Sequence, residues 1–175
     1  MTMPETHTPP PGIRLTPEPL TPQAFTPFGD VVQLASDARR NHVAAAFDRT
    51  SAAVDPRLWV ATVASAAQLP LDLKALERHP FSTQTFLPIN GCAYLVVVCH
   101  ADASGAPDLA TLRAFEAAAD QGVTYARNVW HHGLTVLQAP AKFVVCMSFS
   151  ASGGDDIFVP LAAPVRLVEA ERGTP

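Results

Sequence analysis

The chain has 175 residues, 48% of them hydrophobic, and a formal net charge of -4 at pH 7. This length and composition fit one domain with its own core and exclude a largely disordered chain. The longest cationic cluster, Arg39-Arg40, is too short for the basic stripe of a nucleic-acid-binding surface. The longest strongly apolar run, Ala93 to Cys99, is far shorter than the roughly 20 residues of a membrane helix.

The beginning of the chain is rich in proline, which predicts extended segments and turns. Residues 1–12 are rich in Pro and Thr and predict a disordered tail. Thr21 as N-cap and Pro22 at the first helical position predict one helical turn. A strand is expected to begin at Gly29. Residues 35–56 show no clear period and predict loops with one short strand at most.

The rest of the chain predicts short strands separated by turn residues. The expected strands cover residues 58–63, 73–79, 93–99, 121–125, 134–137, 142–149 and 157–161. Asn90-Gly91 predicts a turn between two β-rich runs, and Asp108 predicts the N-cap of a helix over residues 108–115. Many short strands favour a β-barrel or sandwich. We expect a single domain over residues 13–168, followed by a flexible tail over 169–175.

Cysteine usage and the first residues bear on the cellular compartment. Cys92, Cys99 and Cys146 lie in apolar runs, and none belongs to a Cys-x-x-Cys pair. The odd number argues against a complete disulfide framework, so we expect small buried hydrophobic residues. No cationic region followed by an apolar core begins the chain, so no targeting signal is indicated and a cytoplasmic location is expected.

Polar residues between positions 77 and 91 have the spacing of a binding motif. Glu77 and His79 are two residues apart, so on a strand their side chains point to the same face. Gln84 follows after four residues, and Gly91 after six more. This spacing resembles the first cupin motif, in which two nearby ligand residues are followed by an acidic ligand and a glycine turn. Glu77 occupies the place of the usual first histidine, and Gln84 that of the usual glutamate.

A later segment supplies further histidines. The second cupin motif adds one histidine from a later hairpin, and Trp130-His131-His132 lies near that place. Because neighbours on a strand face opposite sides, His131 and His132 are not both expected to point inward. Tyr125 and Arg127 precede them, two residues apart and on one face.

Together these segments resemble the ureidoglycolate lyase family, formerly named ureidoglycolate hydrolase. The resemblance spans about Leu20 to Leu161 and is carried by Leu76-Glu77-Arg78-His79-Pro80, Ser82-Thr83-Gln84-Thr85-Phe86-Leu87-Pro88, Gly122-Val123-Thr124-Tyr125 and Asn128-Val129-Trp130-His131-His132. It implies a mostly-β, cupin-type barrel (a double-stranded β-helix) with a few short helices, commonly a homodimer. It also implies cleavage of ureidoglycolate to glyoxylate and urea in the breakdown of allantoin and purines, with no redox cofactor.

The resemblance and the residue types together suggest two sets of site residues. The acid–base candidates are His79, His131 or His132, because histidine titrates near neutral pH, and Glu77, which could instead orient His79. The resemblance implies that the substrate is a small carboxylate. The expected substrate-binding residues are Gln84, Tyr125, Arg127 and Trp130, with Arg127 as the clamp for the carboxylate.

Several of these residues have alternative roles. His79 could be a structural histidine, Trp130 a packing residue, and Arg127 part of a surface or interface ion pair. Glu77, His79, Gln84 and a later histidine could instead bind iron, manganese or zinc, although glutamine in place of a carboxylate removes a charge from the ligand set. The main expectation is a site without a metal or another cofactor.

Two stretches depart from the family pattern. Met147-Ser148 stands where the lyases usually carry an Asp-Arg pair, and the lyase stretch with Asn, Gly, Arg and His-Asp has no clear counterpart in residues 39–55. Three functions therefore stay open: a ureidoglycolate lyase, a relative acting on another small hydroxy or oxo carboxylate, and a non-catalytic cupin-like binding protein. Asp155-Asp156, after Gly153-Gly154, is expected to form a solvated turn.

Overall fold

The computed structural model describes residues 12–33 and 39–169, except for the side chains of residues 162–164. The tails expected at 1–12 and 169–175 lie outside the described residues, apart from their inner ends. In chain order the elements are β1 (Ile13–Leu15), β2 (Glu18–Pro19), α1 (Pro22–Phe25), β3 (Gly29–Val32), β4 (Ala53–Val63), β5 (Leu71–Arg78), β6 (Gln84–Pro88), β7 (Tyr94–Cys99), the 3-10 turn η1 (Leu109–Thr111), β8 (Arg113–Ala117), β9 (Gly122–Tyr125), β10 (Trp130–His131), β11 (Thr135–Val136), β12 (Ala141–Ser150) and β13 (Ile157–Leu167). The mostly-β, cupin-like fold expected from the sequence is confirmed.

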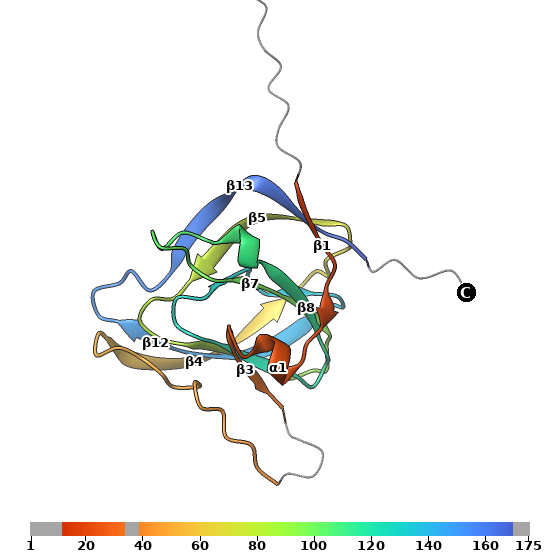
Figure 1. The fold of residues 1–175 in the computed structure, drawn as a ribbon. Helices are drawn as coiled ribbons and strands as arrows, with labels where there is room; N and C mark the ends of the chain where they lie inside the picture. The colour runs from red at the N-terminus through yellow and green to blue at the C-terminus, as the bar shows by residue number, and fades with distance from the viewer. Residues whose placement is uncertain (1–11, 34–38, 170–175) are drawn as a thin grey trace, which may run out of the picture.

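The strands form two sheets (Figure 1). The larger, sheet A, has the order β1-β13-β5-β10-β7-β8-β2, with β11 paired to β7. The smaller, sheet B, has the order β3-β9-β6-β12-β4. Sheet A curls strongly, so that β13 and β5 arch over β7 and β8, whereas β12, β4 and β3 close the opposite side of the half-barrel.

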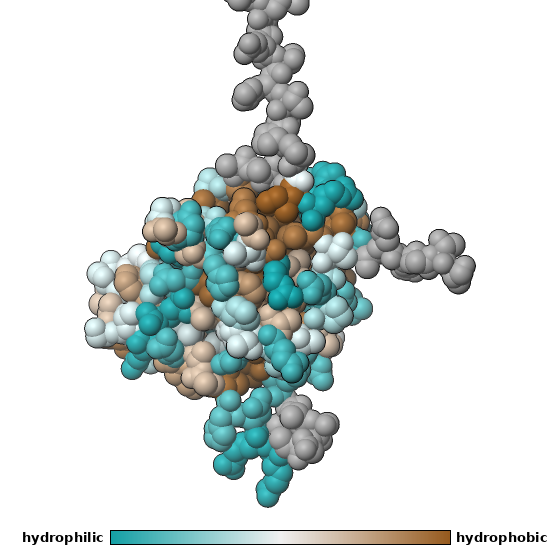
Figure 2. Space-filling model, viewed as in Figure 1, coloured by the Kyte–Doolittle hydropathy of each residue, from teal (hydrophilic) through white to brown (hydrophobic). Residues whose placement is uncertain are grey.

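Strand β7 lies between two hydrophobic cores. Tyr94, Val96 and Val98 pack in the first core, between sheets A and B. Leu95 and Val97 pack in the second core, inside the curl of sheet A. A strand buried on both faces has no polar alternation, which explains the continuous apolar run in the sequence. In Figure 2 apolar side chains gather near β1 and β13, whose partly buried residues cover this second core.

The first elements of the domain agree with the sequence patterns. Thr21 caps α1, since its Oγ1 accepts a hydrogen bond from the amide of Ala24, and Pro22 stands in the first turn, as predicted. Strand β3 begins at Gly29, also as predicted. A side chain is impossible at this position, because a Cβ would lie 1.9 Å from the carbonyl oxygen of Thr124 on the paired strand β9.

The helix predicted over residues 108–115 is wrong beyond its first turn. Asp108 does cap η1, since its carboxylate accepts a hydrogen bond from the amide of Ala110. The chain then extends into β8, where Phe115 packs in the first core and Ala114 in the second. Pairing with β7 and burial on both faces outweigh the local helix propensity. Strands β1 and β2, which the sequence reasoning missed, pair in parallel with β13 and β8.

The turn predicted at Asn90-Gly91 is present, and Gly91 has a φ of 66°. It does not close a hairpin, because β6 belongs to sheet B and β7 to sheet A. Among the described residues, no helix is long and apolar enough to cross a membrane. The three cysteines are free, and two of them, Cys92 and Cys99, are buried.

Candidate active site

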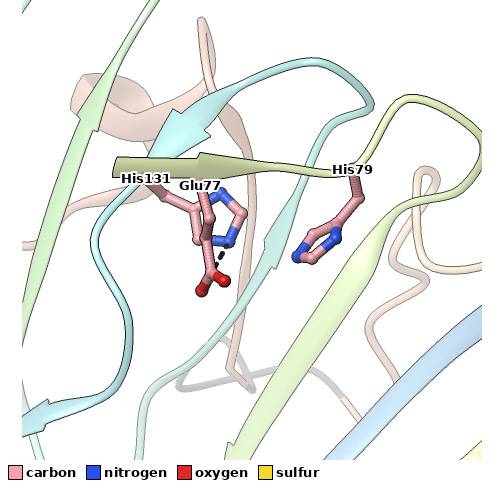
Figure 3. A group of neighbouring side chains, drawn as sticks. All are labelled: Glu77, His79 and His131. Atoms are coloured by element: carbon pink, nitrogen blue, oxygen red, sulfur yellow. Dashed lines mark ion pairs between the residues drawn. The ribbon is translucent and has the colours of Figure 1, made fainter. Parts of the chain in front are cut away.

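Glu77 and His131 lie side by side on the face of sheet A that looks toward sheet B. They are Cα partners across β5 and β10, and directly opposed residues of an antiparallel pair share a face. Nε2 of His131 lies 3.6 Å from Oε1 of Glu77 (Figure 3). His79 follows β5 and adds its ring to the same group, so that one ligand atom of each residue lies within 4.8 Å of the other two.

Sheet B supplies the opposite side of the site. Gln84 on β6 is the Cα partner of both Tyr125 on β9 and Met147 on β12, so the three residues form one row. The ring of Tyr125 stacks on that of His131, with centroids 4.2 Å apart and planes 11° apart. Nε2 of Gln84 donates a hydrogen bond to Sδ of Met147 at 3.6 Å. The candidate site therefore lies between the two sheets.

His131 is held as a neutral imidazole. Its Nδ1 lies 3.0 Å from the carbonyl oxygen of Val129, and a carbonyl only accepts, so Nδ1 carries the hydrogen. Burial, and next the charge of His79, lower the pKa of His131 to about 3. The side chain is 1% exposed, and Nε2 has no hydrogen-bond partner among the described residues. It therefore presents a bare lone pair to the site.

His79 is also buried, and its two ring nitrogens face different surroundings. Nδ1 lies 3.1 Å from the carbonyl oxygen of Asp155 and 3.0 Å from Oδ1 of Asp156. Nε2 is buried without a hydrogen-bond partner among the described residues. The ring is thus anchored from behind and presents Nε2 to the site.

Glu77 is the only one of the three clustered residues with a carboxyl group. Burial raises the pKa of this carboxyl, His79 opposes the shift, and the charge of Asp156 raises the pKa further. The side chain is 17% exposed and lines a surface hollow with Lys74, His132 and Gly133. A carboxyl group with a raised pKa can donate a proton closer to neutral pH than an ordinary glutamate can.

The site is rich in unused acceptors. Nε2 of His79, Nε2 of His131 and Oε1 of Gln84 are all buried without a hydrogen-bond partner among the described residues. Buried polar atoms are normally satisfied, so a group of unsatisfied acceptors indicates a ligand with several hydrogen-bond donors, or a cation. Two imidazole nitrogens and one carboxylate also suit a divalent metal ion such as zinc, iron or manganese.

The other residues expected in the site have hydrogen-bond partners outside the cluster. Nδ1 of His132 lies 3.0 Å from Oγ1 of Thr135, so of the two neighbouring histidines it is His131 that joins the cluster. Trp130 packs in the second core, and its Nε1 donates to the carbonyl oxygen of Gly105. Nε of Arg127 donates to Oδ2 of Asp48 at 2.8 Å, in a partly exposed ion pair.

The residues behind His79 have a role that the sequence patterns did not predict. Asp155-Asp156 is not simply a solvated turn. Asp155 is 6% exposed, and its Oδ1 accepts a hydrogen bond from the amide of Ser150 at 2.7 Å. The preceding Gly153 and Gly154 have positive φ angles of 75° and 80°. This turn brings the aspartates to a histidine more than 70 residues earlier, and the glycine pair was the only local signal of it.

The fold and the cluster define a class of protein: a cupin-like half-barrel with a buried carboxyl–histidine site between its sheets. The sequence profile described as ureidoglycolate lyase matches residues 12–160. The chain is 38% identical to a putative ureidoglycolate lyase of Agrobacterium fabrum over 151 residues, which cover 86% of this chain and 93% of that protein. It is 40% identical to the ureidoglycolate lyase of Brucella melitensis over 140 residues, covering 75% of this chain and 80% of that protein. The chain belongs to the ureidoglycolate lyase family.

Proposed function

We propose that the chain is a ureidoglycolate lyase, which cleaves ureidoglycolate to glyoxylate and urea in the breakdown of allantoin. The observation that carries the proposal is the convergence of Glu77, His79 and His131 within 4.8 Å in a chain of this family. The substrate carries a hydroxyl, ureido N–H groups and a carboxylate. Its several donors complement the unsatisfied acceptors of the site.

The reaction requires two proton transfers and no external water. A base removes the proton of the substrate hydroxyl, and the O–H electron pair forms the carbonyl of glyoxylate. The carbon–nitrogen bond breaks, its electron pair stays on nitrogen, and an acid protonates that nitrogen to give urea. Each positioned acid or base contributes roughly 10²- to 10⁴-fold to the rate.

The residues of the cluster have distinct roles in this proposal. His79 is the base, because its Nε2 is bare and unpartnered. Glu77 is the acid, because burial raises the pKa of its carboxyl and brings proton donation closer to neutral pH. His131 stays neutral and accepts a hydrogen bond from the substrate, as does Oε1 of Gln84. After product release, the proton on His79 returns to Glu77 and restores the starting state.

The substrate carboxylate needs a cationic partner, and we assign this role to Arg127. Nε of Arg127 donates a hydrogen bond to Oδ2 of Asp48, which holds one edge of the guanidinium group in place. A guanidinium has five donors, so a second carboxylate can still be bound. Tyr125 keeps its hydroxyl proton, because burial raises its pKa well above the ordinary value, and it supplies a neutral donor beside His131.

The chemistry balances without a cofactor, and we propose a reaction that needs none. Glu77, His79 and His131 would nevertheless hold a divalent cation, which would polarise a substrate oxygen when bound. Metal analysis of the purified protein and assays with a chelator test this point. If activity disappears with a chelator and returns with one added metal, the reaction needs that metal and the metal-free mechanism is rejected.

The purified chain is expected to release glyoxylate and urea from ureidoglycolate in equal amounts, without ammonia. His79→Gln should lower kcat roughly 10²- to 10⁴-fold. His42→Gln, in an exposed loop, is the matched control and should leave turnover unchanged. Failure of the wild-type chain to form both products, with or without added divalent metal, would reject the lyase function. Full turnover by a folded His79→Gln variant would reject the role of His79.

The homodimer expected from the family is also part of the proposal, and β4 supports it. This edge strand exposes Val54, Leu58 and Val60 at 60%, 68% and 55%, whereas Trp59 and Ala61 pack against the first core. An edge strand that is apolar on both faces is unusual unless a partner covers it. Leu58→Glu should therefore yield a monomer in light-scattering measurements, and Ile89→Glu, at another exposed apolar residue, should not.

A cytoplasmic location completes the proposal. The three free cysteines support it, because thiols stay reduced in the cytosol. Fractionation of the native host, with detection of the chain in the cytosolic fraction, tests this location.

A further inference from the structure

The segment from Gly153 to Asp156 meets His79 at one atom. Nδ1 of His79 lies 3.1 Å from the carbonyl oxygen of Asp155 and 3.0 Å from Oδ1 of Asp156. The segment is fixed in place, because Oδ1 of the buried Asp155 accepts a hydrogen bond from the amide of Ser150 at 2.7 Å. Two oxygens of one turn therefore lie at hydrogen-bond distance from the same ring nitrogen.

These two neighbours determine the tautomer of His79. A carbonyl oxygen and a carboxylate oxygen both accept hydrogen bonds and cannot donate one. In the neutral ring, Nδ1 of His79 therefore carries the hydrogen and Nε2 carries the lone pair. Nε2 is the nitrogen that is buried without a partner and lies in the group with Glu77 and His131. The turn thus directs the basic nitrogen into the site.

The two aspartates contribute differently. The Asp155 side chain is used to anchor the turn, and only its backbone carbonyl faces the ring. Asp156 places its carboxylate beside the ring, although this side chain is itself 49% exposed. The carboxylate therefore adds a charged acceptor to the carbonyl oxygen that also faces Nδ1–H.

We propose that Asp156 is a positioning residue for the lyase reaction, which fixes His79 in the Nδ1–H tautomer and so keeps the lone pair of Nε2 directed toward the substrate. This inference rests on the proposed function, because it assigns His79 as the base. In this proposal Asp156 acts only through the ring of His79.

Kinetics of three Asp156 variants test the proposal. Asp156→Asn and Asp156→Ala should lower kcat roughly 10- to 100-fold with KM changed less than about threefold, as is typical when a carboxylate behind a functional histidine is removed. Asp156→Glu keeps the charge and should recover much of the loss. Asp72→Asn is the matched control. It also removes one carboxylate, but from an exposed ion pair with Arg166 on sheet A, the sheet that carries His79 at the end of β5. It should leave kcat unchanged.

Two results would overturn the role of Asp156. The first is an Asp156→Asn variant that keeps the melting temperature and the kcat of the Asp72→Asn control. The second is a loss of activity in Asp156→Ala that is fully explained by a smaller folded fraction, so that kcat per folded molecule equals that of the wild type. Recovery by glutamate separates a role of the charge from a role of side-chain packing.

A spectroscopic measurement tests the tautomer independently of any activity. Long-range ¹H–¹⁵N correlation spectra of the wild-type chain should show His79 as the Nδ1–H tautomer, and His79→Gln identifies the signal. A hydrogen on Nε2 would reject the proposal even if the enzyme is active. If the chain shows no lyase activity but has the Nδ1–H tautomer, the proposed reaction fails while the positioning contact stands.

Discussion

Tyr125 and His131 stack almost in parallel, with ring centroids 4.2 Å apart, although one belongs to sheet B and the other to sheet A. This contact joins the two sheets at the level of the candidate site. It also covers one face of the ring of His131, whose Nε2 lies 3.6 Å from Oε1 of Glu77 and whose centroid lies 5.1 Å from that of His79. The stack therefore contributes both to stability and to the orientation of a site residue.

Tyr125→Ala should destabilise the chain by about 3 kcal/mol or more, because it removes a buried ring that packs on Phe25, Phe86 and His131. Tyr125→Phe keeps the ring and should cost less than about 1.5 kcal/mol. Urea denaturation measures both values. Equal destabilisation by the two substitutions would show that the hydroxyl, and not the stacked ring, stabilises the fold.

The depressed pKa of His131 predicts an acid-sensitive stability. The folded pKa of about 3 lies below the usual 6.5, so the unfolded chain binds this proton more readily. The stabilising effect of neutral His131 is fully present above pH 6.5 and is lost as the pH falls toward 3. The wild type should therefore lose on the order of 1 kcal/mol per pH unit relative to His131→Gln in this window. A pH-independent difference between the two free energies of unfolding would contradict this.

Glu77→Gln should separate stability from activity. The raised pKa means that the protonated carboxyl is favoured on folding, so its stabilising effect is present below the usual 4.5 and is lost as the pH rises through the folded pKa. Glutamine imitates the protonated form at every pH. The variant should therefore be more stable than the wild type at pH 8 and similar near pH 4, while its kcat falls roughly 10²- to 10⁴-fold. Calorimetry over this pH range, alongside the lyase assay, checks both parts.

Arg127→Gln should raise KM for ureidoglycolate with little change in kcat. Loss of a charge-assisted hydrogen bond costs roughly 1.5–3 kcal/mol, which corresponds to roughly 10- to 150-fold in KM. Asp48→Asn breaks the same ion pair from the other side and leaves the guanidinium in place, so it should change KM far less. An unchanged KM in Arg127→Gln would reject Arg127 as the residue that binds the substrate carboxylate.

Gly29→Ala should destabilise the fold more than Gly91→Ala does. At Gly29 a Cβ would lie 1.9 Å from a carbonyl oxygen of β9, so two paired strands must separate. At Gly91 no atom lies within 4 Å of the added Cβ, and only the positive φ of 66° is unfavourable, which costs about 1–2 kcal/mol. Thermal unfolding of the two variants gives the comparison, and a smaller loss at Gly29 would be the contrary result.

Much of the fold could be predicted from the sequence because its signals are local. The cap at Thr21 and the apolar run of β7 each depend on a few neighbouring residues. The segment after Asp108 was predicted as a helix because the cap is real, but only the tertiary pairing of β8 with β7 reveals the strand. Strands β1 and β2 are short and rich in proline, and they exist only through their parallel partners.

The candidate site was predictable to a smaller extent. The spacing of Glu77 and His79 indicated a shared face, and the structure brings both together with His131. The choice between His131 and His132 depends on the register of β10 against β5, which no local pattern gives. Likewise, Gly153-Gly154 indicates a turn but not its contact with His79, because that contact joins the turn after β12 to the end of β5.

Strand β7 belongs to both hydrophobic cores, and this limits how the chain can unfold. Opening either core removes the packing from one face of β7, the strand whose other face belongs to the second core. The two cores should therefore melt in one cooperative transition. The amides of Val96 and Val97 should be among the last to exchange with deuterium, and they should do so only when the whole domain opens.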